Sequence, residues 1–475
     1  MQESTPLNQS RLSGNAPTAT VPTNGSNGIV SRPLWKQVLI GILVIFRASV
    51  SINIFLILPY IVIHKKGDYF DAIINDHVFL IRDAWLSVKW NIWQFYALTC
   101  ILTVWGSVSI LMLGGRKYYG PPTPSGYRPE YSHSGFRFYL LSITITIPLI
   151  TFFNVSFFYT EFVSLIAVLV VYAFIFSLFC YIKALIAPSN EAECKYSGNP
   201  IVDLWEGIEL YPRIGKNLDL KTLITCRHCL FLLQIIYLVL IKANSELDQG
   251  TDWSTYEKVN WSMLTVTVLQ TFYLAKWFYW EDGYKNTIDF IVERGGYYLM
   301  GACIALIPSL YSLYNLFLVE RSPVKSFGPS LFALVTVLGI ADITCIYLAD
   351  RQRQLCRDSD GRALIWGKEP EVLRVTYIDA NGQERKSLLL SSGFWGLSRH
   401  PNYFFEIIMF LIWSIPAVFS DWKLGLWYTL GTPLFVFLIM WDRSKKDDAK
   451  CKAKYGDKWD EYCRRVPYKI IPYVY

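Results

Sequence analysis

The sequence predicts an all-α polytopic membrane protein, a bundle of about ten transmembrane helices, and three observations support that prediction. Of its 475 residues, 53% are hydrophobic and only 17% are charged, whereas soluble domains carry about 25% charged residues. The mean hydropathy is positive, at +0.28. Long apolar runs also recur along the chain, and about 20 such residues cross a hydrocarbon core of about 30 Å.

Ten apolar runs are expected to span the membrane, and the prolines in several of them are tolerated when neighbouring helices satisfy the freed carbonyls. In chain order the runs lie at 36–63, 93–113, 138–156, 161–187, 223–242, 261–280, 296–319, 328–349, 402–420 and 424–441. Residues 1–34 are rich in Ser, Thr, Asn, Gly and Pro and have no apolar core. We therefore predict a disordered tail at 1–34, N-terminal helices with their loops at 35–260, and a C-terminal core at 261–475.

The charges are distributed as in a membrane protein. The formal net charge of +7 comes from basic residues between apolar runs, as the positive-inside rule predicts, and we expect no nucleic-acid partner. Residues 350–398 and 442–475 are rich in charge, and the two spans between them place both on one side, assigned to the cytosol by their basic excess. Five His and one CxxC pair, Cys226 and Cys229, predict no metal site.

Burying an ionisable group at membrane depth has an unfavourable free energy, so such groups are treated as functional by default. Glu281 and Asp289 follow the run at 261–280 among aromatic and aliphatic residues. We expect both carboxyls to be buried, with pKa values raised by desolvation, although an ordinary loop also accounts for acids there. Tyr298 and Tyr311 lie on one broken helix, where a row of phenols usually reflects packing but also suits a flat polycyclic ligand.

Arg353 and Arg357 are four residues apart where a predicted span leaves the membrane, so they share one helix face. Guanidinium groups bind phosphate through a bidentate fork, although a simple positive-inside anchor would have the same pattern. The segment 442–468 offers Arg, Asp, Tyr and Trp, which suit a nucleotide but also suit a helix on lipid headgroups. No GxGxxG follows a predicted strand, so a dinucleotide would bind between helices and cytosolic loops.

Five collinear motifs resemble one family, the sterol double-bond reductases of the endoplasmic reticulum. They are GPPTPSG at 120–126, SGNP…GIELYPRIG at 197–215, DGRALIWG at 360–367, LLSSGFWGLSRHPNY at 389–403 and CKAKYGDKWDEY…VPY at 451–468. The family includes the Δ14-, Δ24(28)- and Δ7-sterol reductases and the reductase domain of the lamin B receptor. The resemblance implies a ten-helix bundle that uses NADPH on a sterol, with cofactor and sterol pockets in its C-terminal half. It also implies a multi-pass protein of the endoplasmic reticulum membrane in sterol biosynthesis.

The resemblance also assigns site residues. Arg353 and Arg357 would bind the cofactor phosphates. The nucleotide pocket would be lined by Leu390, Trp395, Arg443, Asp447, Tyr455 and Tyr462, and the nicotinamide end would lie beside Arg399, His400, Asn402 and Tyr403. An isolated C=C bond must be protonated before it accepts hydride. The candidates for that acid and for stabilising the cation are Glu281, Asp289, Tyr298 and Tyr311.

Within the family the chain is most similar to the Δ7 branch, in residues 360–370, in an Asn-Gly hairpin signal at 377–383 and in 392–396. It departs from that branch on the substrate side. Phe405–Glu406 stands in place of Gly-Asp, Ala302 in place of Asp, Asn315 in place of Gln, and Asp442 in place of His. Three interpretations stay open: reduction of the Δ7 bond, reduction of another sterol bond at C14 or C24, and a non-catalytic sterol-binding protein or transporter. The oligomeric state is not predicted.

Overall fold

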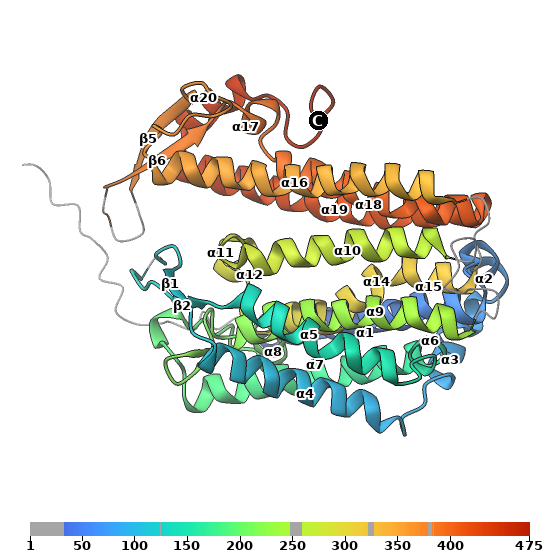
Figure 1. Ribbon diagram of the computed structural model, residues 1–475. Coiled ribbons are helices and arrows are strands. Elements are labelled where there is room, and N and C mark those ends of the chain that lie inside the picture. Colours follow the sequence, from blue (N-terminus) through green and yellow to red (C-terminus); the bar gives the residue numbers. More distant parts are fainter. Residues whose placement is uncertain (1–32, 124, 248–258, 322–326, 379–381, 383) are drawn as a thin grey trace, which may run out of the picture.

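The computed structural model describes residues 33–475 except 124, 248–258, 322–326, 379–381 and 383 (Figure 1). The predicted disordered tail therefore lies almost wholly outside the described residues. Nine helical segments in the described part are long and apolar enough to cross a membrane. They are α1 (Leu34–His64), α4 (Trp93–Met112), α5 (Gly135–Phe152), α7 (Phe162–Ile186), Thr222–Leu247, Tyr297–Glu320, α16 (Pro329–Asp358), α18 (Pro401–Ser420) and α19 (Trp422–Tyr455). The prediction of an all-α polytopic membrane protein is confirmed.

The tenth predicted span is α10 (Trp261–Tyr279), a helix of 19 residues that is less apolar because it contains Gln270 and Lys276. It lies along the other helices and packs against α16 and α18 on one side and α9 (Leu230–Leu247) on the other (Figure 1). Neighbouring helices therefore surround the polar side chains of α10. The observed helix ends fall within a few residues of most predicted ends.

Two of the spans are interrupted by π-helical turns. Thr222–Cys229 is π-helical and continues into α9. The span that begins at Tyr297 is built from α13 (Tyr297–Gly301), the π-helical segment Ala302–Leu306, α14 (Ile307–Tyr311) and α15 (Leu313–Glu320). Pro308 lies at the start of α14 and lacks the N–H that a continuous ladder needs. This span is the broken helix that the sequence predicted.

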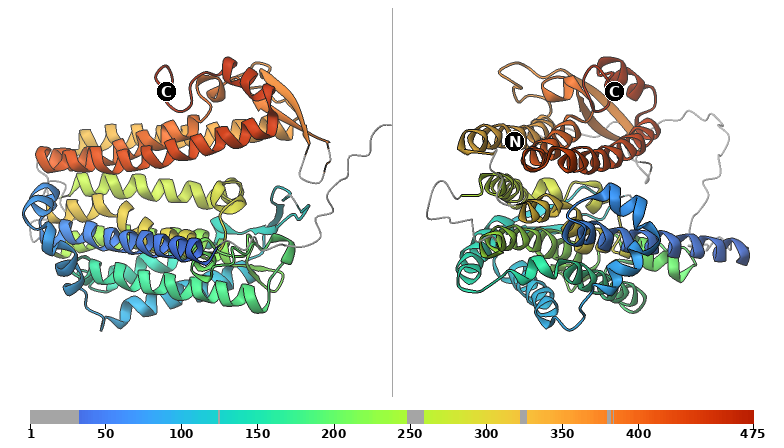
Figure 2. Two further views of the ribbon diagram at one scale, coloured as in Figure 1. Left: turned by 180° about the vertical axis from the view of Figure 1, so that it is seen from behind. Right: turned by 90° about the vertical axis from the view of Figure 1, so that its right-hand side faces the viewer.

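The helices run roughly side by side in layers (Figures 1 and 2). One layer contains α16, α18 and α19, α10 lies next to it, and the N-terminal helices α1, α4, α5 and α7 lie beyond α9 and α15. One large hydrophobic core runs from Phe55 in α1 to Val436 in α19, beside smaller clusters such as the one under the hairpin at 372–390. Both halves of the chain contribute to the large core. The predicted division into N-terminal helices at 35–260 and a C-terminal core at 261–475 therefore stays a prediction about which part contains the functional site.

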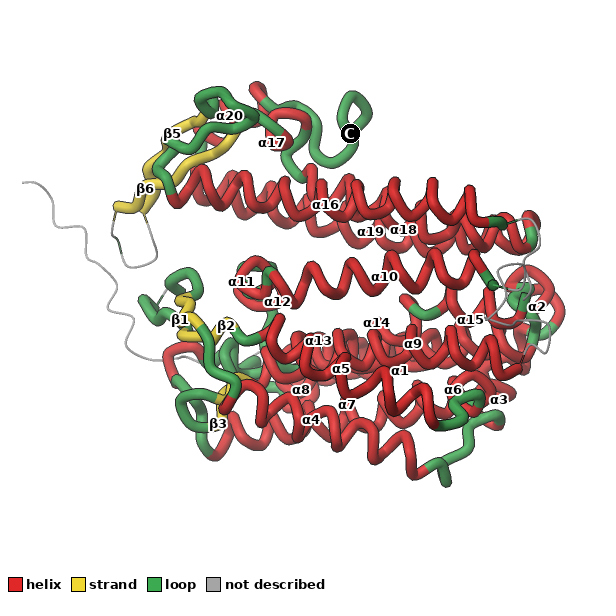
Figure 3. Tube along the Cα trace, in the orientation of Figure 1, coloured by secondary structure: helices red, strands yellow, loops and turns green. Residues whose placement is uncertain are grey.

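Short elements connect the helices, and the hairpins gather at one end of the bundle (Figure 3). The helices among them are α2 (Tyr69–Asn75), α3 (His77–Leu86), α6 (Phe157–Thr160), α8 (Pro200–Glu206), α11 (Glu281–Tyr284), α12 (Ile288–Ile291), α17 (Phe394–Leu397) and α20 (Asp457–Arg465), with a 3-10 turn at Glu191–Glu193. The strands pair as antiparallel hairpins, β1 (Arg116–Tyr119) with β2 (Glu130–His133), β3 (Arg213–Ile214) with β4 (Leu218–Asp219), and β5 (Val372–Ile378) with β6 (Glu384–Leu390).

The helices α16 and α19 extend past their predicted ends. They have 30 and 34 residues, which at about 1.5 Å per residue makes them about 45 and 51 Å long, more than a membrane core needs. The β5–β6 hairpin, with Val372 opposite Leu390, packs against α20 through Leu373, Leu389 and Tyr462. The two charged segments of the sequence thus fold together at one end, as expected for segments on one side of the membrane.

Candidate active site

The protruding end of α16 carries the first group of predicted cofactor residues. The guanidinium of Arg353 lies 4.3 Å from the ring centroid of Trp395 in α17. The indole N–H of Trp395 donates to the Ala349 carbonyl at 2.7 Å, which fixes the ring against α16. Asp350 lies 3.6 Å from Arg353, and Arg357 is exposed one turn further along the helix. No hydrogen bond from the described residues occupies either guanidinium group, which leaves donors for an anion.

Several buried polar atoms at the start of α18 have no hydrogen-bond partner in the described part of the chain, and Nε2 of His400 and Oδ1 of Asn402 are among them. The His400 ring stacks on Tyr403, with centroids 4.8 Å apart, and Asn402 Nδ2 donates to Asp350 at 3.2 Å. Burial lowers the pKa of His400 to about 4, although the Asp447 carboxylate opposes that shift. His400 is therefore neutral near pH 7, and one nitrogen is available to a ligand.

Arg399 binds the C-terminal segment of the chain. Its Nη1 donates to the Val466 carbonyl at 2.9 Å, and its backbone N–H donates to the Tyr468 carbonyl at 2.9 Å. Its guanidinium also lies 3.6 Å from Asp448. These interactions hold the segment after α20 against α18, while Nε of Arg399 is buried without a hydrogen-bond partner among the described residues.

The aromatic residues of the C-terminal segment tie α19 and α20 to the hairpin. The Tyr462 hydroxyl donates to the Leu390 carbonyl at 2.9 Å. The Tyr455 ring packs edge-on to Tyr377, with centroids 5.7 Å apart. On α19, Arg443 and Asp447 are four residues apart and so share one face. The cofactor residues implied by the resemblance thus lie on α16, β6, α17, α18, α19 and α20, which meet at one end of the bundle, or, for Arg399 and His400, in the turn between α17 and α18.

Glu281, one of the predicted acids, is part of a buried ion cluster. Its Oε1 lies 2.9 Å from Arg227 Nη1 and 3.3 Å from Lys285 Nζ, and its Oε2 accepts from the Gly135 N–H at 2.9 Å. Burial alone would raise the pKa of Glu281, but the two cations outweigh burial and hold the pKa at about 2. The expectation of a raised pKa is wrong for Glu281, because the sequence did not reveal that Arg227 lies beside it.

The other three predicted catalytic residues do not converge on Glu281. Asp289 lies 3.0 Å from Arg443 of α19 and its side chain is 21% exposed, so the expectation of a buried carboxyl is wrong for Asp289. Tyr298 is 50% exposed, with its ring against Trp205. Tyr311 packs edge-on to Phe410 of α18, with centroids 5.0 Å apart. The π-helical turn between the two tyrosines breaks the spacing that a continuous row of phenols would need.

A buried polar group that the predicted set omits lies between α10, α16 and α18. The Tyr273 hydroxyl donates to Oε1 of Glu406 at 2.6 Å. Lys276 Nζ and Asp342 Oδ2 are buried and lack hydrogen-bond partners among the described residues. The sequence did signal these groups, because Lys276 and Asp342 interrupt apolar runs and Glu406 follows Tyr403 by three residues. Only the fold brings Tyr273 to Glu406.

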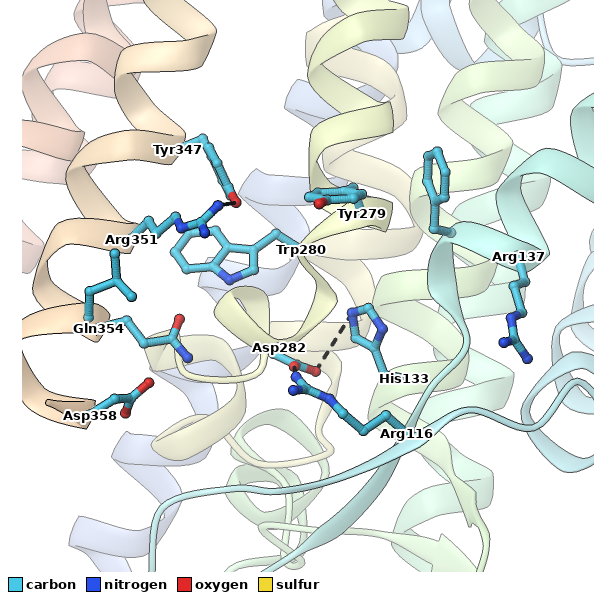
Figure 4. Close-up of a pocket in the computed structure, with 12 residues that line it drawn as sticks. Arg116, His133, Arg137, Tyr279, Trp280, Asp282, Tyr347, Arg351, Gln354 and Asp358 are labelled. Atoms are coloured by element: carbon cyan, nitrogen blue, oxygen red, sulfur yellow. Dashed lines mark hydrogen bonds and ion pairs between the residues drawn. The ribbon is translucent and has the colours of Figure 1, made fainter.

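A cavity of about 640 Å³ opens on the other face of α16. Figure 4 shows Arg351 and Tyr347 of α16 facing Arg116, His133 and Asp282 across it. Arg116 lies 2.9 Å from Asp282 and Arg351 donates to the Tyr347 hydroxyl at 2.7 Å. Residues two apart on a helix face away from each other, so this cavity is separate from the Arg353 side of α16.

Comparison with known proteins gives a consistent set of similarities. A profile of the ergosterol biosynthesis ERG4/ERG24 family matches residues 48–475. The 7-dehydrocholesterol reductase of Arabidopsis thaliana is 36% identical over 77% of this chain and 81% of its own length. That of Danio rerio is 29% identical over 82% of this chain and 80% of its own. The Delta(14)-sterol reductase of Methylotuvimicrobium alcaliphilum is 30% identical over 76% and 78%, respectively.

Proposed function

The chain belongs to the ERG4/ERG24 family of ergosterol biosynthesis, and on that premise we propose that it reduces the Δ7 carbon–carbon double bond of a sterol with NADPH. Two relatives named 7-dehydrocholesterol reductase support the choice of bond, as do the motifs at 360–370 and 392–396. The relative named Delta(14)-sterol reductase leaves reduction at C14 as the second candidate.

The observation that carries the cofactor proposal is the set of unsatisfied polar groups where α16, α18 and α19 meet. Arg353 and Arg357 present guanidinium groups that suit the phosphates of a dinucleotide. Oδ1 of Asn402 and Nε2 of His400 are buried without partners in the described structure, and buried polar groups are normally hydrogen-bonded. A nicotinamide carboxamide has both a donor and an acceptor to offer them. The residues present at this end of the bundle therefore fit NADPH.

When bound, NADPH would supply the hydride that the reduction needs. The chain's own residues have three tasks. Trp395 holds the Arg353 guanidinium in place. Tyr462 keeps α20 against the hairpin and so closes the site on its outer side. Arg399 fixes the C-terminal segment beside His400.

On the sterol side, Asp289, Tyr298 and Tyr311 are proposed to contribute to the wall around the sterol nucleus. Tyr311 and Phe410 offer aromatic faces, which stabilise a carbocation. Asp289 would act on this wall together with Arg443. Glu281 is proposed to serve the fold instead, because its two cationic partners keep it ionised. A sterol is itself a membrane lipid, so we also propose residence in the endoplasmic reticulum membrane.

The test is expression in a yeast strain that lacks its own sterol reductases. The cells are fed 7-dehydrocholesterol and, separately, sterols unsaturated at C14 or C24, and the products are analysed by mass spectrometry. Loss of only the Δ7 bond supports the proposal. Loss of a different bond would support a sterol reductase that acts on another double bond than Δ7. No change in any sterol, with the protein present in the membrane fraction, contradicts the reductase and favours a sterol-binding protein.

A further inference from the structure

Three ionisable side chains of the polar group between α10 and α18 form one buried cluster. The Tyr273 hydroxyl donates to Oε1 of Glu406 at 2.6 Å, and Lys276 Nζ lies 5.3 Å from the Tyr273 ring centroid. Glu406 is 9% exposed, Lys276 8% and Tyr273 6%. Ionisable groups buried in a membrane bundle are costly and mark functional sites by default.

The cluster lies one helical turn inside the proposed cofactor end. Glu406 follows Tyr403 by three residues on α18, so the two share a face and Glu406 lies about 4.5 Å deeper along the axis. Other ionisable groups interact with Glu406 from the surrounding helices: Asp342 and Asp350 of α16, Tyr311 of α14 and Arg443 of α19. Glu406 is thus between the place proposed for the nicotinamide and the aromatic wall of Tyr311.

We propose that Glu406 is the proton donor of the reduction and that Tyr273 and Lys276 are its positioning residues. This inference rests on the proposed function. In the step, the O–H bond of the Glu406 carboxyl breaks and the π electrons of the olefin form a C–H bond to that proton. The carbon left positive accepts the hydride of the nicotinamide donor, which is oxidised, so atoms and electrons balance.

The surroundings of Glu406 suit that role. Tyr273 occupies Oε1, and no hydrogen bond from the described residues reaches Oε2, so Oε2 is free to carry the proton. After transfer, the carboxylate keeps the Tyr273 bond, and the ammonium of Lys276 offsets its charge in surroundings of low dielectric. Lys276 has no hydrogen-bond partner within the described chain, as expected for a group that acts through its charge.

The chain offers a matched control for this tyrosine–glutamate bond. At the other end of the bundle the Tyr159 hydroxyl donates to Oε2 of Glu320 at 2.8 Å, between α6 and α15 (Figure 1). Glu320→Gln and Tyr159→Phe remove the same chemistry far from the proposed cofactor end. We expect both control variants to turn over sterol like the original protein.

The test compares Glu406→Gln, Glu406→Asp and Tyr273→Phe with these controls. We expect Glu406→Gln to lower sterol turnover about 10²–10⁴-fold, the usual contribution of a general acid, with NADPH affinity measured by fluorescence unchanged. The infrared spectrum of the purified original protein minus that of Glu406→Gln should contain the C=O stretch of a protonated carboxyl, and Asp342→Asn identifies the band of another buried carboxyl. Tyr273→Phe should lower kcat and shift the alkaline limb of its pH profile, where the general acid loses its proton, which loss of packing alone would not do.

Two results would overturn the inference: full turnover by Glu406→Gln, or a difference spectrum between the original protein and Glu406→Gln that contains no carboxyl band. If Glu406→Gln does not fold, Tyr273→Phe decides, because it keeps Glu406 and Lys276 in the cluster, and full kcat with an unshifted alkaline limb in that variant contradicts the role. Failure of the original protein to reduce any sterol would instead contradict the proposed function. The infrared band would then still report whether Glu406 carries the proton.

Discussion

Arg443 Nη2 of α19 lies 3.0 Å from the Asp289 carboxylate of α12. The pair joins the C-terminal layer of the bundle to the loop region that follows α10, and both side chains are partly exposed, at 32% and 21%. Asp289 is therefore a partner that orients Arg443, and its effect on a cofactor would pass through that guanidinium.

A double-mutant cycle tests this relationship. We expect Asp289→Asn and Arg443→Met each to weaken NADPH binding, and the double variant to weaken it by less than the sum. Residues in direct contact typically couple by about 0.5–3 kcal/mol. Titration of NADPH by fluorescence measures all four corners of the cycle. Strictly additive losses would mean that Asp289 and Arg443 act independently.

Arg353→Ala should abolish turnover and leave sterol binding intact. The substitution removes a guanidinium that Trp395 holds in place, and a hydrogen bond to a charged group contributes about 1.5–3 kcal/mol. For each hydrogen bond that Arg353 donates to a phosphate, its removal should therefore lower NADPH affinity about tenfold or more. Arg351→Ala is the matched control, because Arg351 lies on the opposite face of α16 beside Tyr347. Unchanged activity of Arg353→Ala would contradict the cofactor assignment.

The spans were predictable from the sequence because the length of an apolar run is set by membrane thickness. The run predicted at 328–349 corresponds to α16 and that at 424–441 to α19. The polar extensions lie beyond the predicted apolar runs, since a helix leaving the membrane no longer has an apolar signature. The spacing of Arg353 and Arg357 nevertheless placed that part of α16 on a helix. The β5–β6 hairpin was indicated by the Asn-Gly signal at 377–383, a local signal that lies mostly outside the described residues, and the pairing of β5 with β6 confirms the hairpin.

The acids were harder to predict than the cofactor end. The cofactor residues lie within the sequence motifs, so the resemblance to the family assigns them directly. The fold then brings the elements that contain these motifs together. The environment of a carboxyl depends on partners far away in the chain, and no local pattern places Arg227 beside Glu281 or Tyr273 beside Glu406. Burial was anticipated for Glu281, but the sign of its pKa shift was decided by those distant partners.

Arg227→Met should destabilise the protein, because it leaves the Glu281 charge buried without its closest cation. Breaking a buried ion pair costs about 3–5 kcal/mol, and both side chains are at most 1% exposed. The measurement is thermal unfolding in detergent. Arg116→Met is a suitable control, because its partner Asp282 is buried but Arg116 itself is 77% exposed. An equal, small shift for both variants would contradict the prediction.

The same cluster predicts acid sensitivity. The pKa of Glu281 is held at about 2, below its ordinary value of 4.5, by Arg227 and Lys285 against the effect of burial. As pH falls, the Glu281 carboxyl is therefore protonated in the unfolded chain before it is protonated in the folded protein. The contribution of Glu281 to stability is complete above about pH 4.5 and is lost between about pH 4.5 and about pH 2. Glu281→Gln should weaken the pH dependence of the free energy of unfolding between about pH 4.5 and about pH 2. An unchanged pH dependence would mean that the ion cluster does not form.

His400 predicts a second window at higher pH. Burial lowers its pKa from 6.5 to about 4, so the folded protein resists protonation that the unfolded chain accepts. Stability linked to His400 is complete above about pH 6.5 and is lost as pH falls to about 4, by about 3 kcal/mol. Because the backbone N–H of His400 donates to the Lys469 carbonyl, protonation of the ring should also loosen the C-terminal segment and weaken NADPH binding. His400→Gln should remove this dependence while the exposed His77→Gln retains it. Equal pH profiles for both variants would contradict the prediction.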